Sequence, residues 1–79
     1  MTRREKLIER IRARPLEADF DDVERLLATF GYERKRQEGS HIAFKKPGAR
    51  TIIVPLVKGR KVKQHYLDQI CEILGLDDD

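Results

Sequence analysis

Two short runs of residues, joined by a proline and a glycine, place the strongest constraint on how this chain can fold. In the run 40–46, an extended backbone would put Ile42 and Phe44 on one side and His41, Ala43 and Lys45 on the other. The run 50–56 is rich in β-branched residues, which favour strands. Between the runs, Pro47-Gly48 has the pattern of a type II turn. The sequence therefore predicts an antiparallel hairpin with one apolar face that other elements must cover.

Helical patterns flank this hairpin on both sides. The first predicted helix, 2–14, begins with a capping-box pattern at Thr2 and Glu5 and ends before Pro15. The second begins near Asp19, which can cap it, and ends at Gly31. Its apolar stripe consists of Phe20, Val23, Leu26, Leu27 and Phe30. The third helix is predicted over about 62–74, after a basic loop at 57–61, and Gly75 is its expected C-cap.

A further strand is predicted at 32–37, because these residues lack helix caps and precede Glu38-Gly39. The predicted order is therefore α-α-β-β-β-α, which is typical of an α+β fold with a three-stranded antiparallel sheet. Helices would cover one face of the sheet and leave the other open. We expect one domain over residues 1–79. Within it, 2–14 would be an extra N-terminal helix, 19–74 the core and 76–79 a frayed acidic tail.

Positive charge is concentrated in the middle of the chain. Residues 34–63 contain ten basic side chains and one acidic side chain, whereas residues 64–79 contain five acidic side chains and no Lys or Arg. A basic block in a strand region is typical of a phosphate-binding surface, although a merely solvated face would have the same composition. We expect phosphate to bind the basic block and the acidic segment to lie outside that surface.

Several other kinds of site are not expected. The two histidines lie 24 positions apart and form no ligand pattern with cysteines or carboxylates, so no metal site is predicted. The glycine-rich phosphate loops of nucleotide-binding proteins are missing. The one cysteine, Cys71, falls among apolar helix positions and is expected to lie in the core. Because no apolar run suits a membrane span or a signal peptide, we expect the chain in the cytoplasm.

His41 is the one residue whose position suggests chemistry. It follows the tight Glu38-Gly39-Ser40 turn, and its strand parity puts it on the open face with Lys45. Histidine side chains ordinarily titrate near pH 6.5 and so can give or take a proton at neutral pH. The alternative for this residue is an inert surface histidine. His65, near the start of the third helix, is expected to be a partly exposed residue without a chemical role.

A run of residues around His41 resembles a known family. Phe30-Gly31-Tyr32 is followed by 36–44, with the sequence RQEGSHIAF, and by Ile53-Val54-Pro55 in the next predicted strand. The closing segment has Lys61-Val62-Lys63 followed by Tyr66-Leu67 and Ile70. Over about 19–74 this pattern resembles the HicA (YcfA/HicA-like) toxins of type II toxin–antitoxin systems.

The resemblance implies a double-stranded-RNA-binding-domain-like fold and an mRNA interferase that uses no cofactor. It implies that His41 is catalytic, that Gly39 serves the turn before it, and that a HicB-like antitoxin covers His41. One departure is that Leu56 and Val57 follow Val54-Pro55, where many family members have a second histidine. With the basic block, the resemblance predicts RNA contacts from Arg34, Lys35, Arg36, Ser40, Lys45, Lys46, Lys58, Arg60, Lys61 and Lys63.

Three functions therefore stay open at the level of the sequence. The first is a toxin endoribonuclease neutralised by a partner protein. The second is a module of the same fold that binds RNA without cutting it, and the missing second histidine favours this alternative. The third is a structural or partner-binding domain. Labelled RNA distinguishes them, because it would be cleaved, retained or ignored.

Overall fold

The computed structural model describes residues 2–76 of the chain. In that part, three α-helices and five strands follow one another in the order α1, β1, α2, β2, β3, β4, β5, α3. The helices are α1 (Arg3–Arg12), α2 (Phe20–Thr29) and α3 (Gln64–Leu74). The strands are β1 (Glu17–Asp19), β2 (Glu33–Glu38), β3 (His41–Lys45), β4 (Ile52–Pro55) and β5 (Lys61–Lys63).

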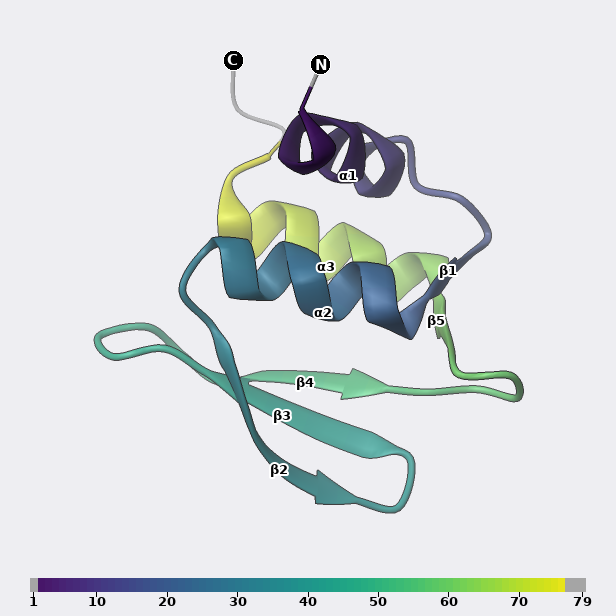
Figure 1. Cartoon of the computed structure of the whole chain (residues 1–79). Helices are drawn as coiled ribbons and strands as arrows, with labels where there is room; N and C mark the ends of the chain where they lie inside the picture. The colour runs from purple at the N-terminus through teal and green to yellow at the C-terminus, as the bar shows by residue number, and fades with distance from the viewer. Residues whose placement is uncertain (1, 77–79) are drawn as a thin grey trace.

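The larger sheet is antiparallel and has the strand order β2-β3-β4. Helices α2 and α3 lie side by side over one of its faces, and α1 lies beyond them on the side away from the sheet (Figure 1). The opposite face of the sheet has no helix over it (Figure 1). The predicted α+β class and the three-stranded antiparallel sheet are confirmed.

The core forms where the helices meet the inner face of the sheet. Ile42 pairs with Val54 and Phe44 with Ile52 across β3 and β4, and all four side chains are buried. Phe20, at the start of α2, contacts the Phe44 ring with a centroid distance of 6.0 Å. The alternation of residues in the hairpin therefore puts its apolar residues inside, as the sequence predicts.

Helix α1 is packed against this core. The Thr2 hydroxyl accepts a hydrogen bond of 3.1 Å from the backbone N–H of Glu5, which confirms the predicted N-cap. Ile11 is completely buried, and its carbonyl oxygen lies 3.9 Å from the Cys71 thiol sulfur on α3. The helix ends at Arg12, two residues before the predicted end, because Arg14 turns into the left-handed region ahead of Pro15.

A second, two-stranded sheet was not predicted. β1 and β5 pair with Ala18 opposite Val62, and both side chains are buried. The third helix therefore begins at Gln64, and the prediction that it begins near Val62 is wrong. The pairing also explains why Asp19 occupies the predicted N-cap position of α2 but makes no side-chain capping hydrogen bond. Its carboxylate accepts from the Lys61 ammonium across the ribbon instead of from a helix N–H.

The structure confirms the predicted turn at Pro47-Gly48 and the predicted helix cap at Gly75, but Leu76 differs from the predicted frayed tail. The N–H of Ala49 donates to the carbonyl of Lys46 at 3.1 Å, and Gly48 has a φ of 79°, which confirms the type II turn. Gly75 ends α3 in the left-handed conformation, as predicted. Leu76, however, is bonded through its N–H to the carbonyl of Cys71 and packs on the core. It is therefore not frayed, and residues 77–79 of the predicted tail lie outside the described residues.

Replacing Ile11 with alanine should destabilise the whole protein, because the side chain is completely buried against α3. Loss of a buried isoleucine side chain down to the β-carbon typically costs about 2–5 kcal/mol. Leu16→Ala is the matched control, since Leu16 is 80% exposed, and its effect should stay within about 0.5 kcal/mol. Urea unfolding measures both changes. Equal effects of the two substitutions would show that α1 does not contribute to the core.

The β1–β5 ribbon should make stability depend on pH. The Lys61 ammonium hydrogen-bonds the Asp19 carboxylate and lowers the pKa of that carboxyl. A carboxyl whose pKa is lowered by folding adds stability above its unfolded pKa and loses it as the pH falls through its folded pKa. Asp19→Asn should therefore lower the thermal midpoint at neutral pH by a small amount, and the difference should disappear in acid. A difference that is constant from neutral to acidic pH would contradict this account.

Candidate active site

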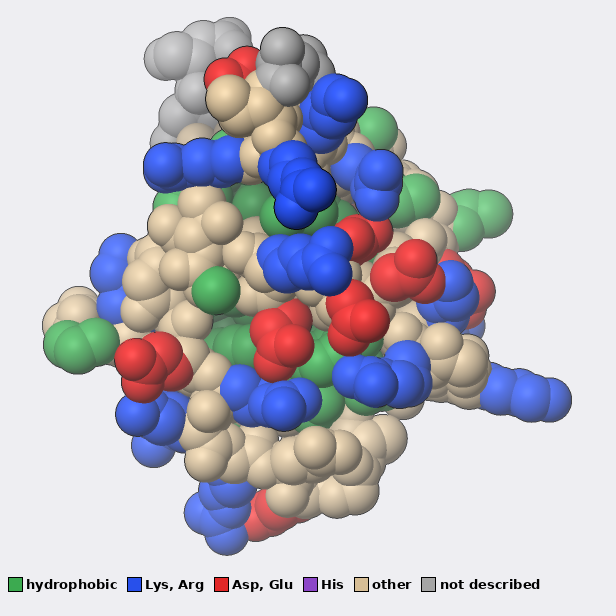
Figure 2. Space-filling model, in the orientation of Figure 1, with side chains coloured by type: hydrophobic (Ala, Val, Ile, Leu, Met, Phe, Trp, Pro, Cys, Tyr) green, Lys and Arg blue, Asp and Glu red, His purple; other side chains and the backbone are tan. Residues whose placement is uncertain are grey.

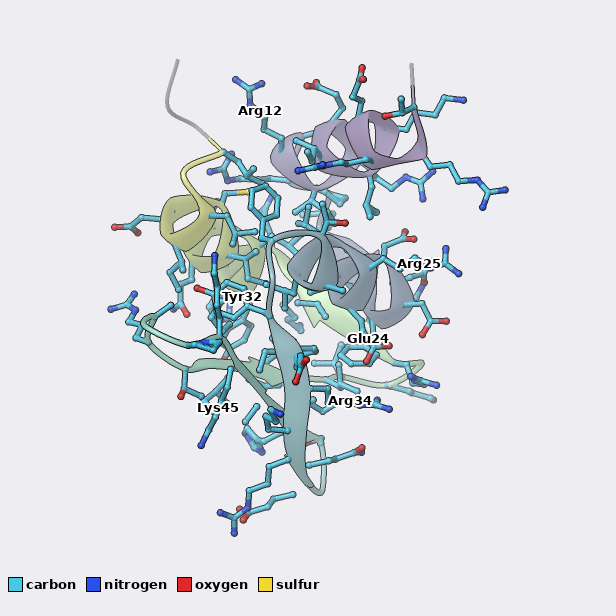
Figure 3. The ribbon with its side chains drawn as sticks, turned by 60° about the vertical axis from the view of Figure 1, so that its left-hand side comes forward. Arg12, Glu24, Arg25, Tyr32, Arg34 and Lys45 are labelled. Carbon is cyan, nitrogen blue, oxygen red and sulfur yellow. The ribbon has the colours of Figure 1, made fainter. Side chains whose placement is uncertain are left out.

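The open face of the larger sheet presents His41. Ile42 and Phe44 point into the core, so the alternate residues of β3 point the other way, and His41 and Lys45 are exposed there. In Figure 3 the Lys45 side chain projects away from the helices. Register pairing places Pro55 and Ile53 of β4 beside His41 and Ala43. The prediction that His41 lies on the open face with Lys45 is confirmed.

A two-residue turn holds His41 directly opposite Glu38. The turn consists of Gly39 and Ser40, and Glu38 and His41 are paired on its two sides. Gly39 has a φ of 59° and Ser40 is not in the positive-φ region, which is the pattern of a type II′ hairpin turn. A Cβ on Gly39 would meet nothing within 4 Å, so the backbone conformation and not lack of space requires glycine here.

His41 and Glu38 line an open depression of about 390 Å³ on this face. Its apolar floor includes Ala43 and Ile53, and the Ile53 side chain is 49% exposed. The positive charge of the depression comes from Arg36 on β2 and Lys45 on β3. The residues lining the depression are Arg36, Glu38, His41, Ala43, Lys45, Thr51 and Ile53.

A β-bulge decides which basic residues of β2 reach this face. Arg36 pairs with Ala43 and lies on the open face, whereas the register shifts between Arg34 and Arg36. Arg34 consequently pairs with Phe44, on the helix side of the sheet, and its Nε lies 3.4 Å from a Glu24 carboxylate oxygen on α2. Figure 3 shows Arg34 and Glu24 between β2 and α2.

Lys35, the residue inside the bulge, is paired with an acid on its own strand. Its Nζ lies 2.8 Å from the Glu33 carboxylate, and this hydrogen bond lowers the pKa of the Glu33 carboxyl. The expected RNA contacts on β2 therefore divide into Arg36 beside His41, Arg34 at the helix side and Lys35 between them.

The remaining basic residues of the expected RNA surface are spread over other parts of the fold. Lys46 lies over the Tyr32 ring, with 5.6 Å between Nζ and the ring centroid. Arg60 lies over the Phe20 ring at 5.3 Å and contacts Asp21, while Lys61 contacts Asp19. Lys58 is exposed in the loop before β5, and Lys63 is exposed at the end of β5.

The face viewed in Figure 2 also shows basic and acidic side chains interleaved, and neither histidine is visible on it. The structure therefore brings Arg36 and Lys45 to His41, with Ser40 in the adjacent turn. It does not bring the other seven predicted contacts into the depression.

Glu38, Thr51 and Ile53 are site residues that were not predicted. A signal for Glu38 was available, because a two-residue Gly39-Ser40 turn places the residues on either side of it opposite each other. Thr51 and Ile53 depended on the exact pairing of β3 with β4, which sequence alone does not determine. His65 is exposed on α3 with its ring centroid 4.0 Å from that of Tyr66, and it does not line this depression.

Within residues 2–76, no three side chains of the metal-binding types gather into a group that could hold an ion. In the same described part of the chain, none of the helices has the length and apolar character that crossing a membrane requires.

Comparison with known proteins assigns the family. A family model described as the HicA toxin of bacterial toxin–antitoxin systems matches residues 20–76, from the first residue of α2 to the residue after the cap of α3. Neither the curated proteins nor the solved structures give a match. The matched region contains the whole β2-β3-β4 sheet and the depression at His41, while α1 and β1 precede it. The chain belongs to the HicA family, the toxins of bacterial toxin–antitoxin pairs.

Proposed function

We propose that this protein is a metal-independent endoribonuclease that cleaves mRNA, with His41 as its catalytic residue. The observation that carries the proposal is that an exposed imidazole shares one depression with two cations, Arg36 from β2 and Lys45 from β3. Cations bind the phosphates of RNA, and a histidine beside a bound phosphate can transfer a proton during cleavage. Membership of a toxin family supports this reading.

RNA is a suitable substrate because it contains its own nucleophile. The 2′-hydroxyl attacks the adjacent phosphorus and displaces the 5′-oxygen of the next nucleotide, giving a 2′,3′-cyclic phosphate and a 5′-hydroxyl. The protein has to bind the phosphate, transfer protons and stabilise the charge on the phosphoryl oxygens. Exposed side chains on an open sheet face can do this without a deep cleft.

The antitoxin of the pair is proposed to be HicB-like and to inhibit the toxin by covering His41. The support lies in the shape of the site. The depression is open and its floor includes the half-exposed Ile53 beside Ala43, so a partner could bury apolar area there and place an acidic group near Arg36 and Lys45. Such a partner would compete directly with RNA.

A second candidate function is RNA binding without cleavage. One observation favours it: His41 pairs with Pro55 on β4, and the residues after Pro55 are Leu56 and Val57, so β4 brings no second imidazole to the site. A module that only binds would still need the cations of the open face. The two candidates differ in whether the product is cut RNA or retained RNA.

His41→Ala should abolish both RNA cleavage and growth inhibition while leaving the fold intact. One positioned acid–base group contributes about 10²–10⁴-fold to a rate, whereas an exposed strand residue contributes little to stability. The measurements are the cleavage rate of a labelled mRNA, the thermal midpoint and the affinity for the antitoxin, and only the first should change greatly.

His65→Ala is the matched control for this variant, because it removes the other histidine of the chain, exposed on α3. It should cleave at the wild-type rate. Undiminished cleavage by a folded His41→Ala protein would remove His41 from the mechanism. Binding without cleavage by the wild-type protein would establish the second candidate instead.

RNA affinity should fall linearly as the logarithm of the salt concentration rises, because binding releases counterions from phosphates. Lys45→Ala should weaken binding to all sequences and reduce the slope of this dependence by about one. Lys6→Ala, on α1, is the control, since α1 lies on the far side of α2 and α3 from the sheet (Figure 1). Affinity that does not change with salt, or equal slopes for Lys45→Ala and Lys6→Ala, would contradict an RNA site on the open face.

A further inference from the structure

Cleavage by 2′-hydroxyl attack needs two proton transfers, and His41 is a single group. One group must take the proton of the 2′-hydroxyl, and another must give a proton to the departing 5′-oxygen. We propose that Glu38 is the general base of this reaction and that His41 is the general acid. This inference rests on the proposed endoribonuclease function and assigns a second catalytic residue at the same site.

The positions of the two side chains meet the geometric requirement. Glu38 and His41 are directly paired on either side of the Gly39-Ser40 turn, and both line the depression. Directly opposite residues of an antiparallel pair have Cβ atoms about 4.5–5.5 Å apart and side chains on the same face. A phosphate bound on the open face over this pair would therefore have a carboxylate on one side and an imidazole on the other.

The composition of the depression leaves Glu38 as the group that can be the base. The charged or titratable groups that face His41 are Arg36 and Glu38 from β2 and Lys45 from β3. β4 contributes Thr51 and Ile53, which carry no charge at neutral pH. Arginine and lysine are ordinarily protonated at neutral pH, so neither can accept the proton of the 2′-hydroxyl. Among the residues lining the depression, Glu38 is the one whose carboxylate can accept this proton and that also lies next to His41.

Arg36 positions this carboxylate. Its Nη2 contacts the Glu38 carboxylate, and the guanidinium has five N–H donors in a rigid planar arrangement. The donors that do not contact Glu38 can bind a phosphate oxygen, so Arg36 can orient the base and bind the substrate at the same time. The second cation, Lys45, is on β3, and Ala43 lies between it and His41 on the open face. Lys45 can therefore contact a neighbouring phosphate.

In the proposed step, two proton transfers accompany the exchange of bonds at phosphorus. The O2′ atom bonds to phosphorus while its proton passes to a Glu38 carboxylate oxygen. The bond from phosphorus to O5′ breaks, and the His41 imidazolium gives its proton to O5′. The products are the 2′,3′-cyclic phosphate and the 5′-hydroxyl, with Glu38 protonated and His41 neutral, and exchange with water restores both groups. On this account no second histidine is needed after Pro55.

Glu38→Gln tests the assignment with little change of shape, because the amide matches the carboxylate in size but cannot take the proton. We expect kcat on an mRNA substrate to fall by about 10²-fold or more. Glu33→Gln is the matched control. Glu33 belongs to the same strand, pairs with Lys45 on the same face and is ion-paired with Lys35, yet it does not line the depression. It should retain wild-type kcat.

The pH profile and the leaving group separate the two roles. Wild-type kcat should rise and then fall with pH, Glu38→Gln should lose the acidic limb, and His41→Ala should lose the alkaline limb. A ribonucleoside 3′-phosphate ester with a nitrophenolate leaving group needs no proton on departure. On this substrate His41→Ala should recover most of its lost activity, whereas Glu38→Gln should not.

The outcomes distinguish this inference from the function on which it rests. If Glu38→Gln cleaves mRNA like the wild type with an unchanged acidic limb, Glu38 is not the base, while the function stands as long as His41→Ala is inactive. If the nitrophenyl ester rescues Glu38→Gln and not His41→Ala, the two roles are reversed and the assignment is overturned. If the wild-type protein cleaves no RNA, both the function and the assignment fail.

Discussion

Burial of the inner side of β3 is the interaction on which the rest of the structure depends. Ile42 and Phe44 are almost completely buried beneath α2 and α3, and each such side chain contributes about 1.5–3 kcal/mol. A shift of the strand by one residue would expose both and force His41 and Lys45 into the core. The same packing that stabilises the sheet therefore keeps the imidazole on the solvent side. Stability and the candidate site are two consequences of one alternation of residues.

Electrostatics divides the basic residues into two groups. Arg34, Arg60 and Lys61 contact acidic side chains on or beside α2, so their charges hold elements together. Exposed ion pairs of this kind contribute little individually, but they orient the side chains that form them. Arg36 differs because its partner, Glu38, is itself part of the depression at His41. The Arg36–Glu38 ion pair orients two side chains of the candidate site, and its contribution to stability is secondary.

The segment that precedes the family match is part of the folded structure. Ile11 is buried against the core, Arg10 contacts Asp22 of α2 at 2.9 Å, and the Gln64 amide donates to the carbonyl of Arg14 at 2.7 Å. β1 then pairs with β5 immediately before α3 begins. These contacts link the N-terminal segment to α2 and α3 on the side of the fold away from the open face, so the segment supports the site without approaching it.

The sequence by itself determined the elements whose signals are local. Alternation placed Ile42 and Phe44 inside and His41 outside, Pro47-Gly48 specified its turn, and the motif around His41 indicated the family. Only the tertiary structure decided what depends on pairing between distant residues. The strand at Lys61–Lys63 exists because Glu17–Asp19 lies beside it, and a three-residue strand has too few residues for a periodic signal. The bulge at Lys35 separates Arg34 from Arg36, and the pairing of β4 brings Ile53 to the depression. Strand register is a property of two segments together, so a site assembled across three strands becomes visible only when they are paired.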